Sequence, residues 1–285
     1  MDSPLLTDRL AIAIGTGFFT AGLLYGCWSL LFRRRHSRLA SYGLIALGWL
    51  VQTVGLVLRG LATHSCPIGN KFEVFQFVAW SCTLLYLFVG PAFRMSLLGF
   101  FTSGMAVLLG VLSLTMPEWD GVARVRPFGS DPIVAFHASL ALFSYGVLAL
   151  FSLTSLMYLL QHRNLRRKRL DGRFSILPSI VELDQMNLRL LAVAVVLLAI
   201  ALGVAGFHWH GHRDLVAPAK LAVTTAVWFA YAAVFVQRLR QRLFAQRFAW
   251  VGFLLFLAPL LSLWIVNAPR QAPAPAAPAI PSPQS

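Results

Sequence analysis

The chain has 285 residues, of which 58% are hydrophobic and only 12% charged, and its mean hydropathy is +0.71. Soluble domains carry about a quarter charged residues, so this composition excludes a soluble globular protein and indicates an integral membrane protein. The formal net charge of +14 is therefore no evidence of nucleic-acid binding, and we expect no nucleic-acid partner.

Eight apolar segments are long enough to cross a bilayer as helices, for which about 20 residues suffice. They do not break down into alternating ten-residue segments, so the sequence favours an all-α polytopic membrane protein over a β-barrel. We take 1–266 as a single transmembrane domain. The apolar segments cover about residues 9–32, 40–60, 72–90, 95–116, 132–160, 189–207, 217–237 and 248–266.

The distribution of Lys and Arg predicts the orientation. With eight spans, the loops 33–38, 91–94, 161–189 and 238–247 lie on one side of the membrane and hold 16 of the 24 basic residues. Basic loops stay in the cytoplasm. Both termini are therefore expected outside, in a multi-pass protein of the cell (inner) membrane.

The outer connection between the second and third spans reads HSCPIGNKFE and contains His64. Glu73 lies at its end, at the outer start of the third span. A carboxylate there is favoured by the helix macrodipole, which is one interpretation of Glu73. The other is a role in a site at the outer face, together with His64.

His137 lies inside the fifth span, about one and a half turns from its outer end, in DPIVAFHASLALFSYG. Ionisable residues within membrane helices usually face the interior of the bundle and often mark function. His137 is thus either a hydrogen-bonded core histidine or a ligand.

The longest inner segment, 161–189, is basic and then amphipathic, which is typical of a topology anchor touching anionic lipid headgroups. The residues after the last span, 267–285, are rich in Pro and Ala and cannot bury a core. They are expected to be disordered.

The outer connection between the sixth and seventh spans begins GFHWHGHRD and carries His208, His210 and His212 around Trp209. Histidine is the commonest metal ligand and the usual axial ligand of haem iron. Three interpretations remain open: a solvated loop, a haem site, or another metal site. Zinc requires three or four protein ligands, and Asp214 is the only carboxylate close by. There is no CxxCH motif, so covalent haem attachment is not indicated.

Three separated stretches together resemble the cytochrome c assembly family of haem-handling membrane proteins, which includes the CcsA/ResC and CcmC types. GNKFEVFQFVAWS resembles the family's N-x-x-E start of a helix and contains Trp80. FHASLALFSYG matches its helix with a histidine followed by Ser-Tyr, here Ser144 and Tyr145. LPSIVELDQMNLRL matches its PS-x-x-x-LD lead into the next helix. The resemblance covers about residues 40–266 and is strongest to the family's shorter branch, the HemX- and YpjD-like proteins.

One part of the sequence departs from the family's pattern. Haem-delivering members carry a tryptophan-rich signature, WGxxWxWDPKE, where this chain has GFHWHGHRDLVAPAK. The family's second membrane histidine would fall near Val236 or Gln237, and neither residue is a histidine.

The resemblance implies a haem-handling factor in cytochrome c-type biogenesis that binds or transfers haem at the outer face. The expected cofactor is non-covalent b-type haem, with His137 and one of the outer-loop histidines as iron ligands and Glu73 nearby. Trp80, Trp119 and Trp209 would cover the macrocycle. The expected partners are haem, apocytochrome c, another maturation membrane protein and the lipid bilayer. No catalytic residue is assigned, and the protein would be at most an accessory part of a haem lyase or cytochrome c synthase system.

Two other functions are open at this point. The resemblance to HemX-like proteins also implies a regulatory or scaffolding protein that binds no haem and captures a partner through 161–189. A transporter with a histidine-lined opening is the third hypothesis, although the paired Gly/Pro-broken helices of many transporters are missing.

Overall fold

The computed structural model describes residues 4–32, 37–63, 66–92, 97–120, 132–167, 178–209 and 218–266, with the backbone alone at 4–6, 92, 209 and 264–266. Within these ranges the regular structure is helical, which confirms the predicted all-α fold. The elements in chain order are α1 (Pro4–Leu31), α2 (Arg38–Thr63), α3 (Lys71–Ala92), α4 (Leu98–Thr115), the short 3₁₀ helix η1 (Pro117–Trp119), α5 (Pro132–Arg166), α6 (Ile180–Trp209), α7 (Pro218–Leu239), α8 (Ala245–Leu255) and α9 (Leu257–Val266).

Eight helical spans among the described residues are long and apolar enough to cross a membrane, as predicted. Helices α1 to α7 form seven of them, and α8 and α9 together form the eighth. The break between α8 and α9 falls at Phe256. Pro259 explains it, because proline has no amide hydrogen and its ring clashes with the carbonyl four residues earlier, that of Leu255.

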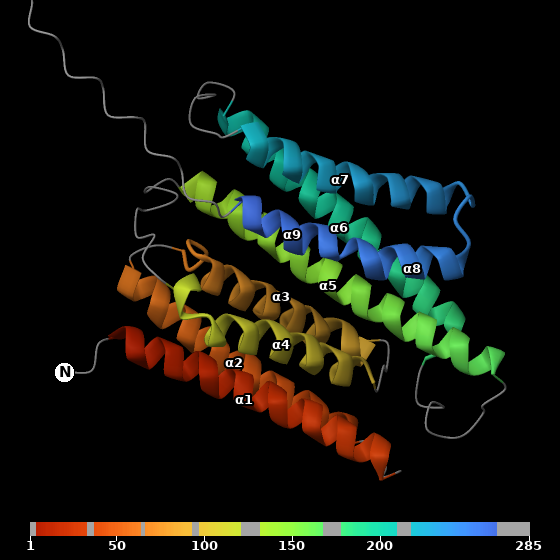
Figure 1. Ribbon diagram of the computed structural model, residues 1–285, viewed down its shortest axis with the longest axis horizontal. Helices are drawn as coiled ribbons and strands as arrows, with labels where there is room; N and C mark the ends of the chain where they lie inside the picture. Colours follow the sequence, from red (N-terminus) through yellow and green to blue (C-terminus); the bar gives the residue numbers. More distant parts are fainter. Residues whose placement is uncertain are drawn as a thin grey trace, which may run out of the picture.

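The helices run alongside one another in two groups (Figure 1). In the first group α1 packs against α2 and α4, and α3 packs against α4. Helix α5 lies between the groups, with α3 on one side and α6 and α8 on the other. Helix α7 packs against α6 and α9 at the edge of the second group.

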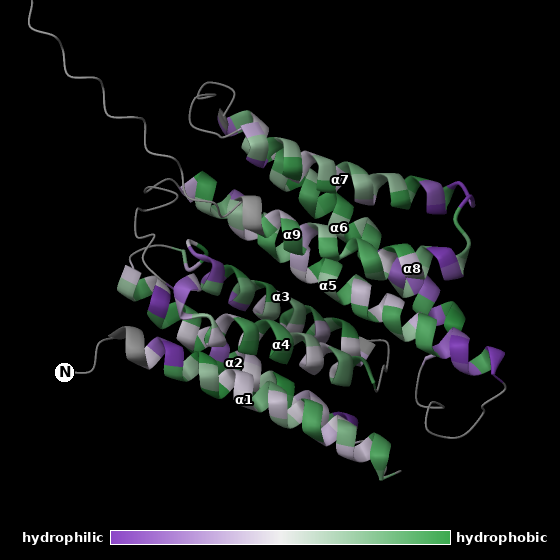
Figure 2. Ribbon diagram, in the orientation of Figure 1, coloured by the Kyte–Doolittle hydropathy of each residue, from purple (hydrophilic) through white to green (hydrophobic). Residues whose placement is uncertain are grey.

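Hydrophobic residues follow the lengths of the helices, and hydrophilic residues gather towards their ends (Figure 2). One end of the bundle holds the first turns of α1, α3, α5 and α7, and we call it the predicted outer face. The opposite end, with the first turns of α2, α4, α6 and α8, is the predicted inner face. The beginning of α1 and the end of α9 both lie at the predicted outer face (Figure 1).

Two helices extend further at the predicted inner face than their apolar runs indicate. Helix α5 continues to Arg166 and α6 begins at Ile180, so both reach into the segment expected to be a loop over 161–189. Residues 161–166 contain no Gly or Pro and include good helix formers, so polarity alone does not end the helix. Long basic side chains also bring their charge to the water while the backbone stays helical. The segment 168–177 and the tail 267–285 lie outside the described residues.

The two groups of helices meet through a small residue. Gly146 of α5 faces Ser81 of α3, and a β-carbon at Gly146 would lie 2.7 Å from Ser81 Cβ and 3.0 Å from the backbone nitrogen of Cys82. Lipid chains are as apolar as leucine, so membrane helices associate largely through close packing of this kind. The contact fixes α5, and with it His137, relative to α3.

Candidate functional site

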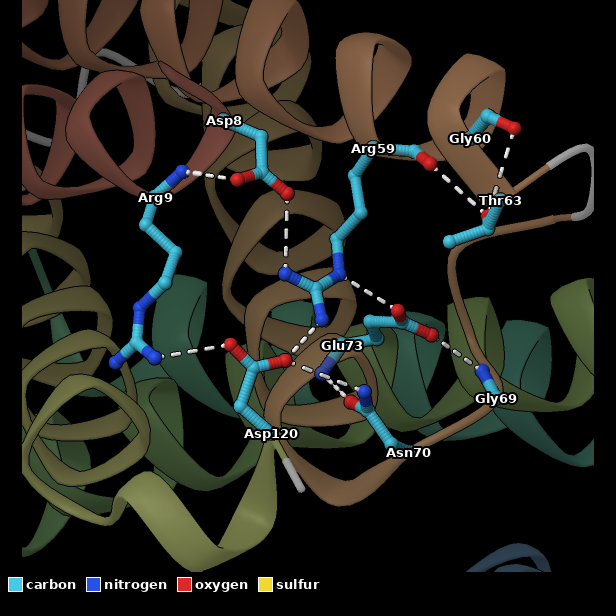
Figure 3. A network of polar contacts seen from close by, with 9 residues as sticks. All are labelled: Asp8, Arg9, Arg59, Gly60, Thr63, Gly69, Asn70, Glu73 and Asp120. Carbon is cyan, nitrogen blue, oxygen red and sulfur yellow. Dashed lines mark hydrogen bonds and ion pairs between the residues drawn. The ribbon is translucent and has the colours of Figure 1, made fainter. Parts of the chain in front are cut away.

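A buried arginine near the end of α2, Arg59, gathers three carboxylates at the predicted outer face (Figure 3). Its Nε donates to Glu73 Oε1 at 2.6 Å, and its Nη1 donates to Asp8 Oδ2 at 3.0 Å. Its Nη2 donates to Asp120 Oδ1. These carboxylates come from α3, from α1 and from the residue after η1, so one side chain joins four parts of the chain. We call Asp8, Arg9, Arg59, Glu73 and Asp120 the outer charge network.

Arg9 supplies the second cation of this network. Its Nη1 donates to Asp120 Oδ2 at 3.0 Å, and its backbone N–H donates to Asp8 Oδ1 at 2.6 Å. Both guanidinium groups lie over the ring of Phe72, with Cζ to centroid distances of 5.4 Å for Arg9 and 4.8 Å for Arg59, within cation–π range. Asp8 is 0% exposed and Arg59 is 4% exposed, so the centre of the network lies inside the bundle.

The loop before α3 completes the hydrogen bonding of two carboxylates. The backbone N–H of Gly69 donates to Glu73 Oε2 at 2.6 Å, and the Glu73 N–H donates to Asn70 Oδ1 at 2.8 Å. Asn70 therefore caps the first turn of α3, a position where asparagine is strongly favoured. Its Nδ2 also approaches Asp120 Oδ1 at 3.4 Å.

The outer charge network requires its internal pairing. Taking an ion out of water costs several kcal/mol, which is offset only when partners and hydrogen bonds surround it. Three carboxylates here share two guanidinium groups, and each carboxylate accepts from more than one donor. The network therefore locks α1 and α2 to the start of α3 and to the end of η1.

His137 lies on a different side of the bundle, between α5 and α6. Its Nδ1 is 2.7 Å from the carbonyl oxygen of Ala201, and because a carbonyl only accepts, Nδ1 carries the proton. The ring is half-buried. Histidines that bind metals commonly donate their other ring N–H to a carbonyl in this way, which fixes the tautomer and the ring orientation. Coordination by His137 would therefore use Nε2.

Of the other four candidate histidines, the structure describes His208 alone. His208 is half-buried in the last turn of α6, seven residues or about 10 Å of helical rise beyond Ala201. His64, His210 and His212 lie outside the described residues. Within the described ranges, no group of three or more His, Cys, Asp or Glu side chains is arranged to hold a metal ion.

The three tryptophans expected near a macrocycle belong to three different elements, α3, η1 and α6. Trp80 is in the middle of α3, where its Nε1 donates to Thr53 Oγ1 at 2.8 Å and its ring stacks on Trp49 at 5.7 Å. Trp119 is in η1 at the predicted outer face and packs against Phe75, with ring centroids 4.8 Å apart. Trp209 is the last residue of α6, and the structure describes only its backbone.

The PS-x-x-x-LD stretch organises the predicted inner face. Ser179 and Glu182 form a reciprocal capping box at the start of α6, with N···O distances of 3.1 and 3.2 Å. Leu183 is fully buried. Asp184 accepts from Arg238 Nη2 at the end of α7.

Arg238 also fixes the turn that follows α7. Its Nη1 donates to the carbonyl of Leu243 at 2.8 Å, and its guanidinium lies over Phe248, 5.3 Å from the ring centroid. The sequence stretch therefore joins the inner ends of α6, α7 and α8.

Sequence reasoning found Glu73 but missed its partners in the outer charge network. Glu73 lies in the first turn of α3, as its position predicts, and both of its oxygens are engaged by Arg59 and Gly69. Asp8, Arg59 and Asp120 were not singled out. The network could have been predicted from Arg59, a charged residue near the end of an apolar run. Charged residues within membrane helices are usually paired.

Comparison with known proteins identifies a family match over most of the chain. Residues 68–272 match the family described as Cytochrome C assembly protein. This range begins just before α3 and includes α3 to α9, whereas α1 and α2 precede it.

Curated relatives agree with this match. Protein HemX of Brevibacillus brevis is 30% identical over 211 residues, which cover 73% of this chain and 77% of the relative. Protein HemX of Bacillus subtilis (strain 168) is 27% identical over 176 residues, covering 60% and 63% of the two chains. Cytochrome c biogenesis protein CcsA of Porphyra purpurea is 31% identical over 150 residues, covering 50% of this chain and 46% of the relative.

Proposed function

The chain belongs to the cytochrome c assembly protein family and has a role in cytochrome c biogenesis, and from this premise we propose that it binds and transfers haem at its predicted outer face. The membrane context is established by the eight apolar spans. We further propose that this membrane is the cell's inner membrane and that haem is held there without a covalent bond.

The observation that carries this proposal is the hydrogen bond from His137 Nδ1 to the Ala201 carbonyl, 2.7 Å long, inside a membrane helix. It fixes the tautomer and orientation of the imidazole, so that iron would be coordinated through Nε2, as in protein metal sites. A histidine of this kind on α5 is also where the family resemblance places a haem ligand.

The second iron ligand would be His208, which the structure places in the last turn of α6 and not in the outer loop, or one of His64, His210 and His212. Bound haem would supply redox-active iron, and the histidines that hold it and the polarity around them would tune its potential. We propose that the protein acts with another maturation membrane protein and delivers haem towards apocytochrome c. None of the chain's side chains is assigned a catalytic role.

Haem content of the purified protein tests the proposal. The protein is purified in detergent after expression with added haem, and its absorption spectrum and haem-to-protein ratio are measured. A Soret band with a reproducible haem-to-protein ratio of about one, or a constant fraction of one, supports the proposal. A preparation with no Soret band after haem supplementation contradicts it.

A second candidate function is a scaffold or regulator that binds no haem. The resemblance to HemX-like proteins implies it, and a cluster of exposed arginines at the inner end of α5, Arg163, Arg166 and Arg167, supports it. Such a protein would capture an acidic partner through these side chains. Replacing all three with Glu should then abolish partner capture, whereas His137→Ala should leave capture intact.

A further inference from the structure

Asp120 differs from the other two carboxylates of the outer charge network in its place in the chain. Asp8 and Glu73 are fixed on the helices α1 and α3, whereas Asp120 follows η1 in the connection between α4 and α5. Its two oxygens bridge two guanidinium groups, with Oδ2 accepting from Arg9 at 3.0 Å and Oδ1 accepting from Arg59 (Figure 3). A carboxylate between two arginines is a strong, charge-assisted arrangement.

The bridge formed by Asp120 is also the accessible side of the network. The side chains of Arg9 and Asp120 are 35% and 13% exposed, whereas those of Arg59 and Asp8 are 5% and 0% exposed. An incoming group would therefore meet Arg9 and Asp120 first.

Removal of Asp120 would leave the buried Arg59 paired with two carboxylates. Arg59 would keep its contacts with Glu73 Oε1 and Asp8 Oδ2. The guanidinium of Arg9 would lose its carboxylate partner and keep only a 3.5 Å contact with the carbonyl oxygen of Leu114. Asp120 can thus move out of the network while Arg59 stays paired with Asp8 and Glu73. Arg9 can then donate to another carboxylate.

We propose that Arg9 and Arg59 form a carboxylate-binding clamp, that Asp120 is its internal occupant, and that the incoming ligand is the propionate group of a porphyrin. The choice of a porphyrin rests on the proposed function. The guanidinium fork suits a carboxylate in bidentate geometry. Trp119, half-buried next to Asp120, adds an aromatic surface beside the clamp.

Asp120 would act in this arrangement as a competitor built into the chain. A site that is open for only part of the time binds its ligand with an apparent affinity reduced by that fraction. If Asp120 fills the clamp about nine-tenths of the time, its removal strengthens porphyrin binding about tenfold. Loss of Arg9 should weaken binding to a similar extent.

The test uses the full-length protein in detergent and two iron-free probes, protoporphyrin IX and its dimethyl ester, which lacks the carboxylates. Binding is followed by porphyrin fluorescence and by quenching of tryptophan fluorescence in the wild type, Asp120→Asn and Arg9→Gln. Glu118→Gln is the matched control, because Glu118 is an exposed acid two residues before Asp120. The absence of iron separates this test from iron ligation by His137, so either proposal can fail alone.

The expected result is about tenfold tighter binding of protoporphyrin IX to Asp120→Asn. Binding to Arg9→Gln should be about tenfold weaker, because a charge-assisted hydrogen bond to the carboxylate is lost. The dimethyl ester should bind all four proteins alike, and Glu118→Gln should match the wild type. Equal shifts in Asp120→Asn and Glu118→Gln, an equal gain for the ester, or no porphyrin binding to any form would overturn the proposal. If Asp120→Asn does not fold, the partly exposed Arg9→Gln is decisive on its own. Weaker binding of protoporphyrin IX to Arg9→Gln supports the proposal, and unchanged binding overturns it.

Discussion

Arg59 of α2 and Glu73 of α3 form an ion pair of 2.6 Å in which the two side chains are only 5% and 6% exposed. Glu73 lies within the range matched by the family and Arg59 lies before it. The pair therefore attaches the α1–α2 hairpin to the family core at the predicted outer face. Gln52 adds a second attachment deeper in the bundle, where its Nε2 donates to Gln76 Oε1 at 2.7 Å.

Replacing Arg59 should unfold the outer end of this attachment. Arg59→Gln leaves the carboxylates of Asp8 and Glu73 buried without their cation, and loss of one partner of a buried ion pair costs about 3–5 kcal/mol. Thermal unfolding of the detergent-solubilised protein measures the effect. The control is Arg163→Gln, an exposed arginine at the end of α5, which should unfold like the wild type. Equal stability of the two variants would show that the network is not needed.

The contact between α3 and α5 should not tolerate a methyl group. In Gly146→Ala the new β-carbon would lie 2.7 Å from Ser81 Cβ, so the helices must move apart, at a cost of about 1–3 kcal/mol. Gly203→Ala on α6 is the control, since nothing lies within 4 Å of its β-carbon position. That change should be neutral or stabilise by up to about 1 kcal/mol. Opposite signs in the unfolding midpoints are expected, and a tolerated Gly146→Ala would refute the close approach.

Gln241 in the turn between α7 and α8 should gain stability on replacement with glycine. Its φ is +54°. Gln241 and the next residue make the two hydrogen bonds of a helix C-cap, from Gln241 N–H to Arg238 O and from Arg242 N–H to Gln237 O. A side chain in this left-handed region costs about 1–2 kcal/mol, part of which glycine recovers. We expect Gln241→Gly to stabilise by about 0.5–1 kcal/mol. Gln246→Gly, in the helical part of α8, should destabilise, and the same sign for both would contradict this.

The inner ion pair should show a measurable coupling energy. A double-mutant cycle with Asp184→Asn and Arg238→Gln should give about 1–2 kcal/mol, since the contact is charge-assisted and both side chains are largely buried. Glu182→Gln combined with Arg238→Gln is the control cycle. Glu182 bonds to Ser179 at the cap of α6, so this cycle should be additive within about 0.5 kcal/mol. Equal coupling in both cycles would mean that general inner-face charge, and not the pair, is responsible.

Length and composition of the apolar runs were enough to predict the eight spans, because a helix is the one open-chain structure that satisfies its backbone in lipid. The helix ends were less predictable. Helix α5 runs on to Arg166 because basic side chains at a membrane surface do not break a helix. The start of α6 at Ile180 depends on the capping box of Ser179 and Glu182, which lies in the PS-x-x-x-LD stretch.

The outer charge network was not predictable from local sequence. Arg59 and Asp120 are 61 positions apart, and Arg59 and Asp8 are 51 apart, so their pairing depends on helix packing. Apolar periodicity carries no information on such contacts. Glu73 was found because a carboxylate in the first turn of a helix has a local physical reason, whereas Asp8 and Arg59 have only a tertiary one.

His137 carries the central claim that this chain binds haem, and the most direct test is the Soret spectrum of two histidine variants prepared with added haem. His162 is the matched control, a half-buried histidine of the same helix at the predicted inner face, stacked on Tyr158 at 6.1 Å. We predict that His137→Ala loses the Soret band or shifts it, whereas His162→Ala keeps the wild-type band at the same haem-to-protein ratio. Identical spectra and haem contents in the two variants would contradict the account.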